Sequence, residues 1–267
     1  MKPQNEHQHN HKYSNVILEG KGKAVVMVHG TMMDRTMFAP QIQAIKDGYC
    51  AIAYDQRART PAYNTPYYLK DLADDCRSLL DDLGIEKCVL LGMSMGGYMA
   101  TEFIRHFSDR VEALVMVGSK LGSYSQEEQE LYMKEFHKFD YDGFVSQELA
   151  REAASFILGS YTLKNNPVLV SDTLQSWTKL PAKSVLSEVQ SWIGKDDYTT
   201  TARNFGKPVL VIHGEDDQAI PVEKATNVME KAFPNVEIVR IPNAGHTVNL
   251  EAPERTNEVL RSFLDSL

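Results

Sequence analysis

The sequence has few of the residues and runs that mark several large protein classes. It contains three cysteines in 267 residues, and Cys50, Cys76 and Cys88 show neither a CxxC pair nor a metal-like spacing. Because Cys50 and Cys88 lie in apolar runs, we interpret them as small buried side chains in a reducing compartment. This cysteine usage argues against a disulfide-stapled secreted domain.

Long apolar runs and an excess of basic residues are also missing. No run approaches the roughly 20 apolar residues of a membrane-spanning helix, and the polar start of the chain lacks the apolar stretch of a secretory signal. The formal net charge of −8 argues against a nucleic acid or an anionic membrane as the partner. We therefore expect a cytoplasmic protein with no nucleic-acid or membrane partner, and its oligomeric state stays open.

The sequence carries no signature of a dinucleotide or zinc site. The glycine-rich stretch 92–97 does not follow the GxGxxG pattern, and no zinc motif occurs. His7, His9 and His11 alternate in the polar segment 1–12, but no acidic or cysteine partner completes a metal site there. We expect a disordered tail over these residues, and neither cofactor nor metal in the protein.

Short apolar runs alternate with helical patterns along much of the chain. Such runs fit strands that are buried on both faces, as in a parallel sheet. Between the second and third runs, apolar side chains spaced for one helix face extend from Leu69 to Leu83 and stop at Gly84. The alternation predicts an α/β fold with a mostly parallel, doubly wound sheet and right-handed crossovers. The runs cover residues 24–28, 51–54, 89–91, 113–117, 209–212 and 236–241.

The alternation fails between about residues 119 and 205. Helical patterns occur there near residues 127–138, 144–158 and 184–193, with no convincing strand. A helical insertion between two strands of one sheet would cover the strands' carboxyl ends, where open α/β sheets bind ligands. We predict a core domain formed by residues 13–120 and 206–267, and a helical cap formed by residues 121–205.

The pattern Gly92-Met93-Ser94-Met95-Gly96 lies between a strand-like run and a helical stretch. A strand that turns abruptly into a helix strains its corner residue, whose side chain then projects alone above the sheet. Glycines two positions on either side remove side chains that would collide at so tight a corner. A serine between glycines is often only a turn, but this order of elements favours Ser94 as a nucleophile.

A serine hydroxyl needs a base to take its proton and an acid to orient that base. Two loops that directly follow strand-like runs supply such groups: residues 214–221 contain Asp216 and Asp217, and residues 243–246 end at His246. Both loops should lie at the same rim of the sheet as Ser94. An imidazole exchanges protons near neutral pH, so His246 is the predicted general base.

Over about residues 16–264 the chain resembles the α/β-hydrolase superfamily, in particular its capped serine-esterase and enol-lactonase-like branch. The resemblance rests on His29-Gly30-Thr31, Ser94 in GxSxG, the Gly-x-x-Asp-x-x-x-Pro loop and Gly245-His246. It implies an α/β-hydrolase fold with an inserted helical cap, and a catalytic triad in the order Ser, Asp, His.

The resemblance also implies particular roles for residues around this triad. The family's acid stands four residues before the proline, which is Asp217 rather than Asp216. The oxyanion hole would consist of the backbone N–H groups of Thr31 and Met95. His29 would shape the loop ahead of that hole, whereas His213 precedes the acid loop too closely to reach the serine.

Methionines are frequent in the two segments that should frame the acyl pocket. We predict that Met32, Met33 and Met93 contact an apolar acyl group of the substrate, and ordinary core filling is the alternative. In one place the chain departs from the family, because Arg57-Ala58-Arg59 replaces a glycine-bearing turn. Its two arginines either hold a substrate carboxylate or form salt bridges to Asp55 or a neighbour.

A serine at the corner argues against haloalkane dehalogenase and typical epoxide hydrolase chemistry, for which this superfamily uses aspartate. The resemblance therefore implies a cofactor-free serine hydrolase that cleaves a small-molecule carboxylic ester or lactone through an acyl-enzyme. The same triad also serves carbon–carbon bond hydrolases, thioesterases and cofactor-free perhydrolases. Some members of the fold are ligand receptors, so these alternatives stay open.

Overall fold

The computed structural model describes residues 14–267, so the predicted tail over residues 1–12 lies outside the described residues. One seven-stranded sheet has the order β1-β3-β2-β4-β5-β6-β7. β1 runs antiparallel to β3, and every other neighbouring pair is parallel. The strands are β1 (Val16–Glu19), β2 (Lys23–Val28), β3 (Tyr49–Tyr54), β4 (Cys88–Met93), β5 (Val111–Val117), β6 (Val209–Gly214) and β7 (Val236–Ile241).

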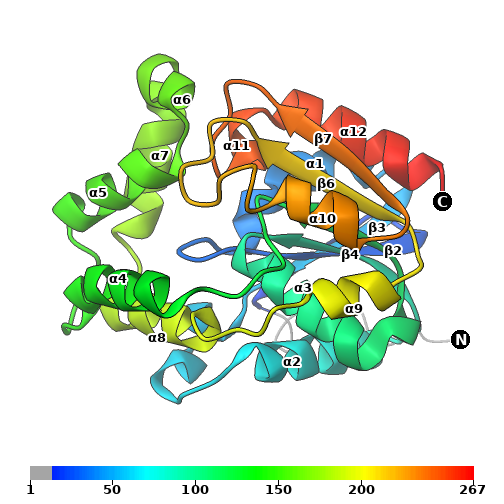
Figure 1. Cartoon of the computed structure of the whole chain (residues 1–267), viewed down its shortest axis with the longest axis horizontal. Coiled ribbons are helices and arrows are strands. Elements are labelled where there is room, and N and C mark those ends of the chain that lie inside the picture. Colours follow the sequence, from blue (N-terminus) through cyan, green and yellow to red (C-terminus); the bar gives the residue numbers. More distant parts are fainter. Residues whose placement is uncertain (1–13) are drawn as a thin grey trace, which may run out of the picture.

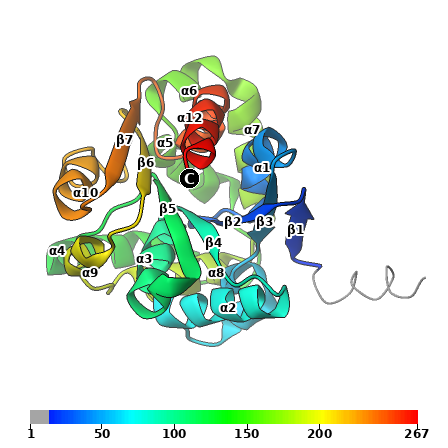
Figure 2. The same cartoon turned by 90° about the vertical axis from the view of Figure 1, so that its right-hand side faces the viewer.

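Helices cover both faces of this sheet, as Figure 2 shows. Successive side chains of a strand point to opposite faces, so Val25 and Val89 pack in one core cluster while Val26 and Leu90 pack in the other. α1 and α12 cover the first face, and α2, α3 and α10 cover the second (Figure 2). These helices are α1 (Ala39–Ile45), α2 (Leu69–Asp82), α3 (Met95–Phe107), α10 (Thr226–Ala232) and α12 (Pro253–Asp265), and the short α11 (Val248–Glu251) precedes α12.

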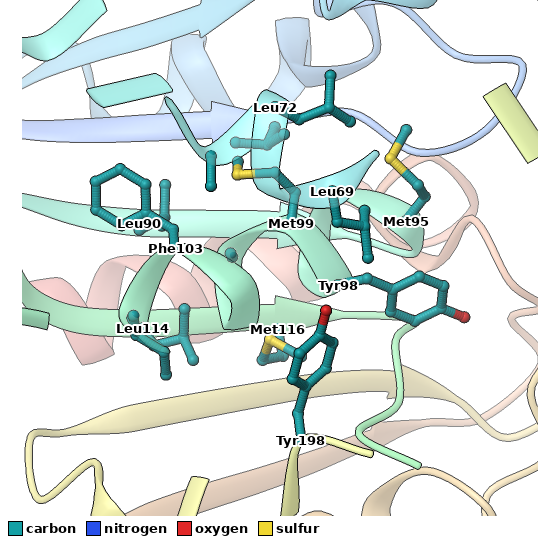
Figure 3. Close-up of a cluster of buried hydrophobic side chains, with 14 of the residues drawn as sticks. Leu69, Leu72, Leu90, Met95, Tyr98, Met99, Phe103, Leu114, Met116 and Tyr198 are labelled. Carbon is teal, nitrogen blue, oxygen red and sulfur yellow. The ribbon is translucent and has the colours of Figure 1, made fainter. Parts of the chain in front are cut away.

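The second core cluster joins α2 and α3 to the sheet. Figure 3 shows Leu72 of α2 and Met99 and Phe103 of α3 in one cluster with Leu90 of β4. Burying one such side chain completely contributes roughly 1.5–3 kcal/mol. α2 ends where the sequence predicts, because Gly84 adopts φ 68° and the N–H of Ile85 reaches back to the carbonyl of Leu80 at 2.8 Å.

A helical insertion follows β5 and precedes β6 in the chain. It lies beyond the carboxyl ends of the parallel strands (Figure 1). The predicted helical patterns correspond to α4, α5 and α8, and α4 begins with a capping box between Ser125 and Glu128. α6, α7 and α9 were not predicted. The helices are α4 (Gln126–Phe136), α5 (Gln147–Ile157), α6 (Ser160–Asn165), α7 (Pro167–Trp177), α8 (Ala182–Trp192) and α9 (Thr199–Asn204).

The predicted fold class is therefore confirmed, with one strand added. The six predicted runs correspond to β2–β7, whereas β1 was missed. β1 is a four-residue edge strand whose side chains are at most half-buried. Its apolar run Val16-Ile17-Leu18 was a usable signal, although a short one. The boundaries assigned to core and cap stay predictions.

Candidate active site

Ser94 stands at the corner between β4 and α3, with φ 52° and ψ −117°. A non-glycine residue held in such a conformation costs of order 1–3 kcal/mol, so surrounding contacts must fix it. The Ser94 N–H donates to the carbonyl of Val117 at 2.8 Å. The Ser94 carbonyl accepts from the Ser119 hydroxyl at 2.9 Å and from the Gly97 N–H at 2.8 Å. The corner is thus held on both sides of the serine.

The glycines of the motif are required by close backbone approach. A Cβ on Gly92 would lie 2.3 Å from the carbonyl oxygen of Gly96. A Cβ on Gly96 would lie 2.1 Å from the carbonyl oxygen of Val28 in the neighbouring strand. Neither backbone atom can move aside as the end of a flexible side chain can, so only glycine fits at these two positions.

Ser94, His246 and Asp217 form one buried hydrogen-bonded chain. The Ser94 hydroxyl lies 2.8 Å from Nε2 of His246, and Nδ1 of His246 lies 2.8 Å from Oδ2 of Asp217. The other carboxylate oxygen of Asp217 accepts the N–H of Ile220 at 2.8 Å. A carboxylate can only accept, so Nδ1–H of His246 donates to Asp217 and Nε2 is left to accept from the serine.

The neighbouring acid, Asp216, has a different task. Its Oδ2 accepts the N–H of Ser160 at the start of α6 at 2.5 Å, and this hydrogen bond lowers the pKa of the Asp216 carboxyl. Asp216 therefore holds the helical insertion to the loop after β6. The two adjacent aspartates point to different partners, and Asp217 is the one that contacts His246.

The two other histidines of the sequence analysis brace loops. Burial lowers the pKa of His29 to about 3, so the ring is neutral and its Nε2 accepts the N–H of Gln56 at 3.0 Å. Burial also lowers the pKa of His213, whose Nε2–H donates to the carbonyl of Ile220 at 2.8 Å. The same nitrogen lies 3.2 Å from Oδ2 of Asp217. His213 thus supports the acid loop by hydrogen bonding.

The backbone N–H groups of Thr31 and Met95 lie near Ser94 and have no acceptor within residues 14–267. Met95 is the first residue of α3, so its N–H lies at the positive end of that helix. The Thr31 hydroxyl accepts the indole N–H of Trp192 at 3.1 Å. It is thereby bound to α8, while the Thr31 backbone N–H stays free.

A model of the alpha/beta hydrolase fold matches residues 23–253. The chain belongs to the α/β-hydrolase family. Non-heme chloroperoxidase CPO-A1 of Kitasatospora aureofaciens is 26% identical over 259 residues, which cover 92% of this chain and 94% of that protein.

Solved structures agree with this assignment. A thermophilic esterase from Thermogutta terrifontis, solved with malate bound, is 28% identical with a TM-score of 0.87. The match covers 94% of this chain and 92% of the esterase. The enol-lactonase from Burkholderia xenovorans LB400 has a TM-score of 0.84 at 20% identity, covers 94% and 95% of the two chains, and shows the fold alone. The predicted family resemblance is confirmed.

The site of this α/β-hydrolase opens into a cavity of about 100 Å³ under the helical insertion. Met32, Met33 and Met93 line it, together with Ser94 and His246. Aromatic side chains from the insertion and α3 form much of the wall; these are Tyr98, Tyr124, Tyr132, Phe136, Phe156, Trp177 and Trp192. Sequence reasoning missed these aromatics, although the i, i+4 spacing of Tyr132 and Phe136 in α4 was a usable signal.

A second, larger depression adjoins this cavity between α4 and α5. It measures about 400 Å³ and shares Tyr132, Phe136, Ala153 and Phe156 with the cavity at Ser94. Lys138 closes one rim by bridging Glu135 of α4 and Glu152 of α5 at 2.6 and 2.7 Å. The remaining lining is mainly apolar, so the two hollows adjoin through a largely apolar wall.

The two arginines of the unusual turn form salt bridges outside this cavity. Arg57 pairs with Asp75 of α2 at 2.6 Å, and Arg59 pairs with Glu188 of α8 at 2.6 Å. Asp55, named as a candidate partner, instead pairs with Arg35. Neither arginine lines the cavity at Ser94, so the salt-bridge interpretation holds for both.

Two kinds of feature are absent from the described residues. No group of three or more His, Cys, Asp or Glu side chains in the span 14–267 is arranged to hold a metal ion. Over the same span, no helix combines the length and the apolar character needed to cross a membrane.

Proposed function

We propose that the protein hydrolyses a carboxylic ester or lactone through an acyl-enzyme formed on Ser94. The observation that carries the proposal is the buried chain of hydrogen bonds from the Ser94 hydroxyl through His246 to Asp217. In this geometry Nε2 of His246 already accepts a hydrogen bond from the Ser94 hydroxyl. Asp217 binds Nδ1–H and so fixes the imidazole tautomer that leaves Nε2 free to accept. A serine, an imidazole and a carboxylate so arranged suit acyl transfer.

The reaction follows from these contacts in two halves. The Ser94 oxygen attacks the substrate carbonyl, its proton passes to Nε2 of His246, and the carbonyl electrons move onto the oxygen. Collapse of this intermediate breaks the ester bond, and His246 gives the proton to the departing alcohol. Water then attacks the acyl-enzyme with His246 again as base, and the carboxylic acid leaves. Asp217 stabilises the imidazolium that forms twice in each cycle.

The backbone N–H groups of Thr31 and Met95 are the proposed oxyanion hole. Both donors are free in the described part of the chain, and that of Met95 is reinforced by the dipole of α3. In a serine hydrolase, loss of one such donor typically costs about 3 kcal/mol of transition-state stabilisation. Donors held in place before the charge develops need no reorganisation during the reaction.

The cavity favours an uncharged, apolar acyl group. Within the described residues, neither a carboxylate of Asp or Glu nor a lysine or arginine side chain lines it. Met32, Met33 and Met93 offer flexible thioethers that adapt to irregular apolar groups. We propose that a short acyl group fills the cavity and that longer chains extend into the depression between α4 and α5.

A second candidate is cofactor-free perhydrolysis on the same acyl-enzyme. The relative named non-heme chloroperoxidase favours it. In that reaction hydrogen peroxide replaces water in the second half and a peracid leaves. Carbon–carbon bond cleavage, thioester hydrolysis and a receptor role stay as the remaining alternatives.

A substrate panel separates these functions. Wild type and Ser94→Ala are assayed on p-nitrophenyl esters, lactones, thioesters and vinylogous diketones, with and without hydrogen peroxide. We expect sustained ester or lactone turnover that Ser94→Ala abolishes with the fold intact. The control is Ser78→Ala, an exposed serine of α2 whose hydroxyl donates to Asp74, and it should match wild type. Stoichiometric acylation without turnover indicates a receptor, and activity retained in Ser94→Ala refutes the assigned nucleophile.

A further inference from the structure

A carboxylate from α8 reaches the loop that carries the proposed oxyanion donor. Oε2 of Glu188 accepts the backbone N–H of Met32 at 2.9 Å, across 156 positions of sequence. The same oxygen accepts Nη2–H of Arg59 at 2.6 Å. Both side chains are buried, with 0% of the Glu188 side chain and 5% of the Arg59 side chain exposed. An ion pair from two distant segments is therefore enclosed beside the loop.

The arginine binds the following residue of that loop. Nε–H of Arg59 donates to the carbonyl of Met33 at 2.7 Å. Glu188 and Arg59 thus form hydrogen bonds with the two residues directly after Thr31, Met32 and Met33. Trp192, one turn further along α8, binds the Thr31 hydroxyl. The helical insertion and the unusual Arg57–Arg59 turn together hold the segment 31–33.

The segment 31–33 has a backbone conformation that depends on contacts with other parts of the protein. Met32 has φ 63°, a value that residues with side chains rarely adopt. A residue persists in such a conformation only when its surroundings over-determine it. The Met32 N–H and the Thr31 carbonyl belong to one peptide plane, so the bond to Glu188 fixes the peptide directly after Thr31. The Thr31 N–H belongs to the preceding Gly30–Thr31 peptide, whose rotation about Thr31 this bond restrains.

Stability alone is a poor explanation for this ion pair. Burying two charges costs more than packing apolar side chains of similar size, and such pairs are often neutral or unfavourable for stability. Within the described residues the second oxygen of Glu188, Oε1, has no hydrogen-bond partner. The carboxylate is thus incompletely satisfied, whereas its contact with the loop is well formed. This pattern fits a group retained for the geometry that it imposes.

We propose that Glu188 and Arg59 are positioning residues: they hold the segment 31–33 so that the Thr31 N–H points toward the developing oxyanion. The oxyanion hole is then complete only when α8 is docked on the core, so the insertion controls turnover as well as access. This inference rests on the proposed function, because it assumes that the Thr31 N–H stabilises a developing oxyanion. Neither residue touches the substrate in this account.

The test compares Glu188→Leu, Glu188→Gln, Arg59→Lys and Arg59→Met with the control Ser187→Ala. Ser187 is the preceding residue of α8, and its hydroxyl binds the carbonyl of Tyr63 without touching the loop. The measurements are kcat and KM on a short p-nitrophenyl ester, thermal unfolding, and Ki for an alkyl boronic acid. The boronic acid forms a tetrahedral adduct with the serine, so its binding reports the oxyanion hole without turnover.

We expect Glu188→Leu to lower kcat by about 10- to 100-fold, short of the full loss of one donor, with KM changed less than about threefold. Ki for the boronic acid should rise in parallel. Glu188→Gln keeps an oxygen for the Met32 N–H and should lose less, as should Arg59→Lys relative to Arg59→Met. Ser187→Ala should leave all three quantities unchanged.

Two results overturn the inference. Folded Glu188 variants with wild-type kcat and boronic-acid Ki would reduce the pair to a structural contact. A loss confined to KM or to thermal stability would do the same. If Glu188→Leu does not fold, the kcat and boronic-acid Ki of Glu188→Gln and Arg59→Lys test the inference instead. The outcome is separate from the proposed function: wild type that neither hydrolyses esters nor binds the boronic acid refutes both, whereas active but unchanged variants refute only this inference.

Discussion

Replacing Asp217 by asparagine changes the charge of the acid with almost no change of shape. Oδ1 of Asp217 accepts the Ile220 N–H and Oδ2 faces Nδ1 of His246, both at 2.8 Å. In the variant, the side-chain oxygen of the asparagine still accepts the hydrogen bond from the Ile220 N–H. The asparagine NH₂ group then takes the place of Oδ2 and faces His246. A donor then faces Nδ1, so the imidazole must carry its proton on Nε2. With Nε2 protonated, His246 cannot take the proton of Ser94.

The size of the loss follows from this change of tautomer. In a serine-protease triad the corresponding Asp→Asn replacement lowers kcat by about 10⁴, or about 5.4 kcal/mol at 1.36 kcal/mol per factor of ten. Nε2 of His213 lies 3.2 Å from the replaced oxygen and already donates to Ile220, so it cannot serve as an acceptor for the new NH₂. We expect kcat to fall about 10³- to 10⁴-fold with KM changed less than about threefold.

The assay is steady-state hydrolysis of a p-nitrophenyl ester, and Asp216→Asn is the matched control. Asp216 binds Ser160 rather than His246, and asparagine retains an oxygen for that N–H. Its kcat should stay within about threefold of wild type. The reverse ranking would reassign the acid to Asp216. A folded Asp217→Asn variant within tenfold of wild type would refute the tautomer argument.

Three further expectations concern stability, pH and substrate length. Gly96→Ala places a Cβ 2.1 Å from the Val28 carbonyl and should lower the free energy of unfolding by at least about 3 kcal/mol; Gly194→Ala, which meets nothing within 4 Å, is the control in urea denaturation. The pKa of His29 is about 3, against 6.5 in the unfolded chain, so the unfolded state binds its proton first as the pH falls. The stabilising contribution of the neutral His29 ring is complete above about pH 6.5 and declines by about 1.4 kcal/mol per pH unit toward pH 3. His29→Gln should therefore flatten the plot of unfolding free energy against pH between about pH 6 and 4. An unchanged slope contradicts this expectation. On p-nitrophenyl esters, kcat/KM should rise from acetate to octanoate by up to about fourfold per CH₂, because chains beyond butyrate enter the depression between α4 and α5. Ala153 lies where the cavity meets the depression, so Ala153→Phe should abolish the gain in kcat/KM beyond butyrate, whereas Ala153→Ser should keep it. If both variants show the same dependence on acyl length, the acyl chain does not enter the depression.

Periodicity and motif spacing were enough to predict most of the core from the sequence. Strands β2–β6 are largely buried on both faces, and their apolar runs reflect that burial directly. β7 is a half-buried edge strand, whose apolar residues Val236, Ile238, Val239 and Ile241 were still enough to predict it. α7 was missed although Val170, Thr173, Leu174 and Trp177 follow helical spacing and Pro167 marks its start. α9 carries three consecutive threonines, which disfavour a helix, and it forms because it packs on α3 and α10.

The sequence by itself determined the strand–corner–helix that presents Ser94 and the two loops that bring acid and base to the same rim. These features are local, because they depend on residue types within a few positions of one another. Only the tertiary structure decided that Asp216 binds Ser160 of the insertion and that Arg59 pairs with Glu188. These choices depend on how distant segments dock, and a pairing across more than a hundred residues leaves no periodic trace in the chain.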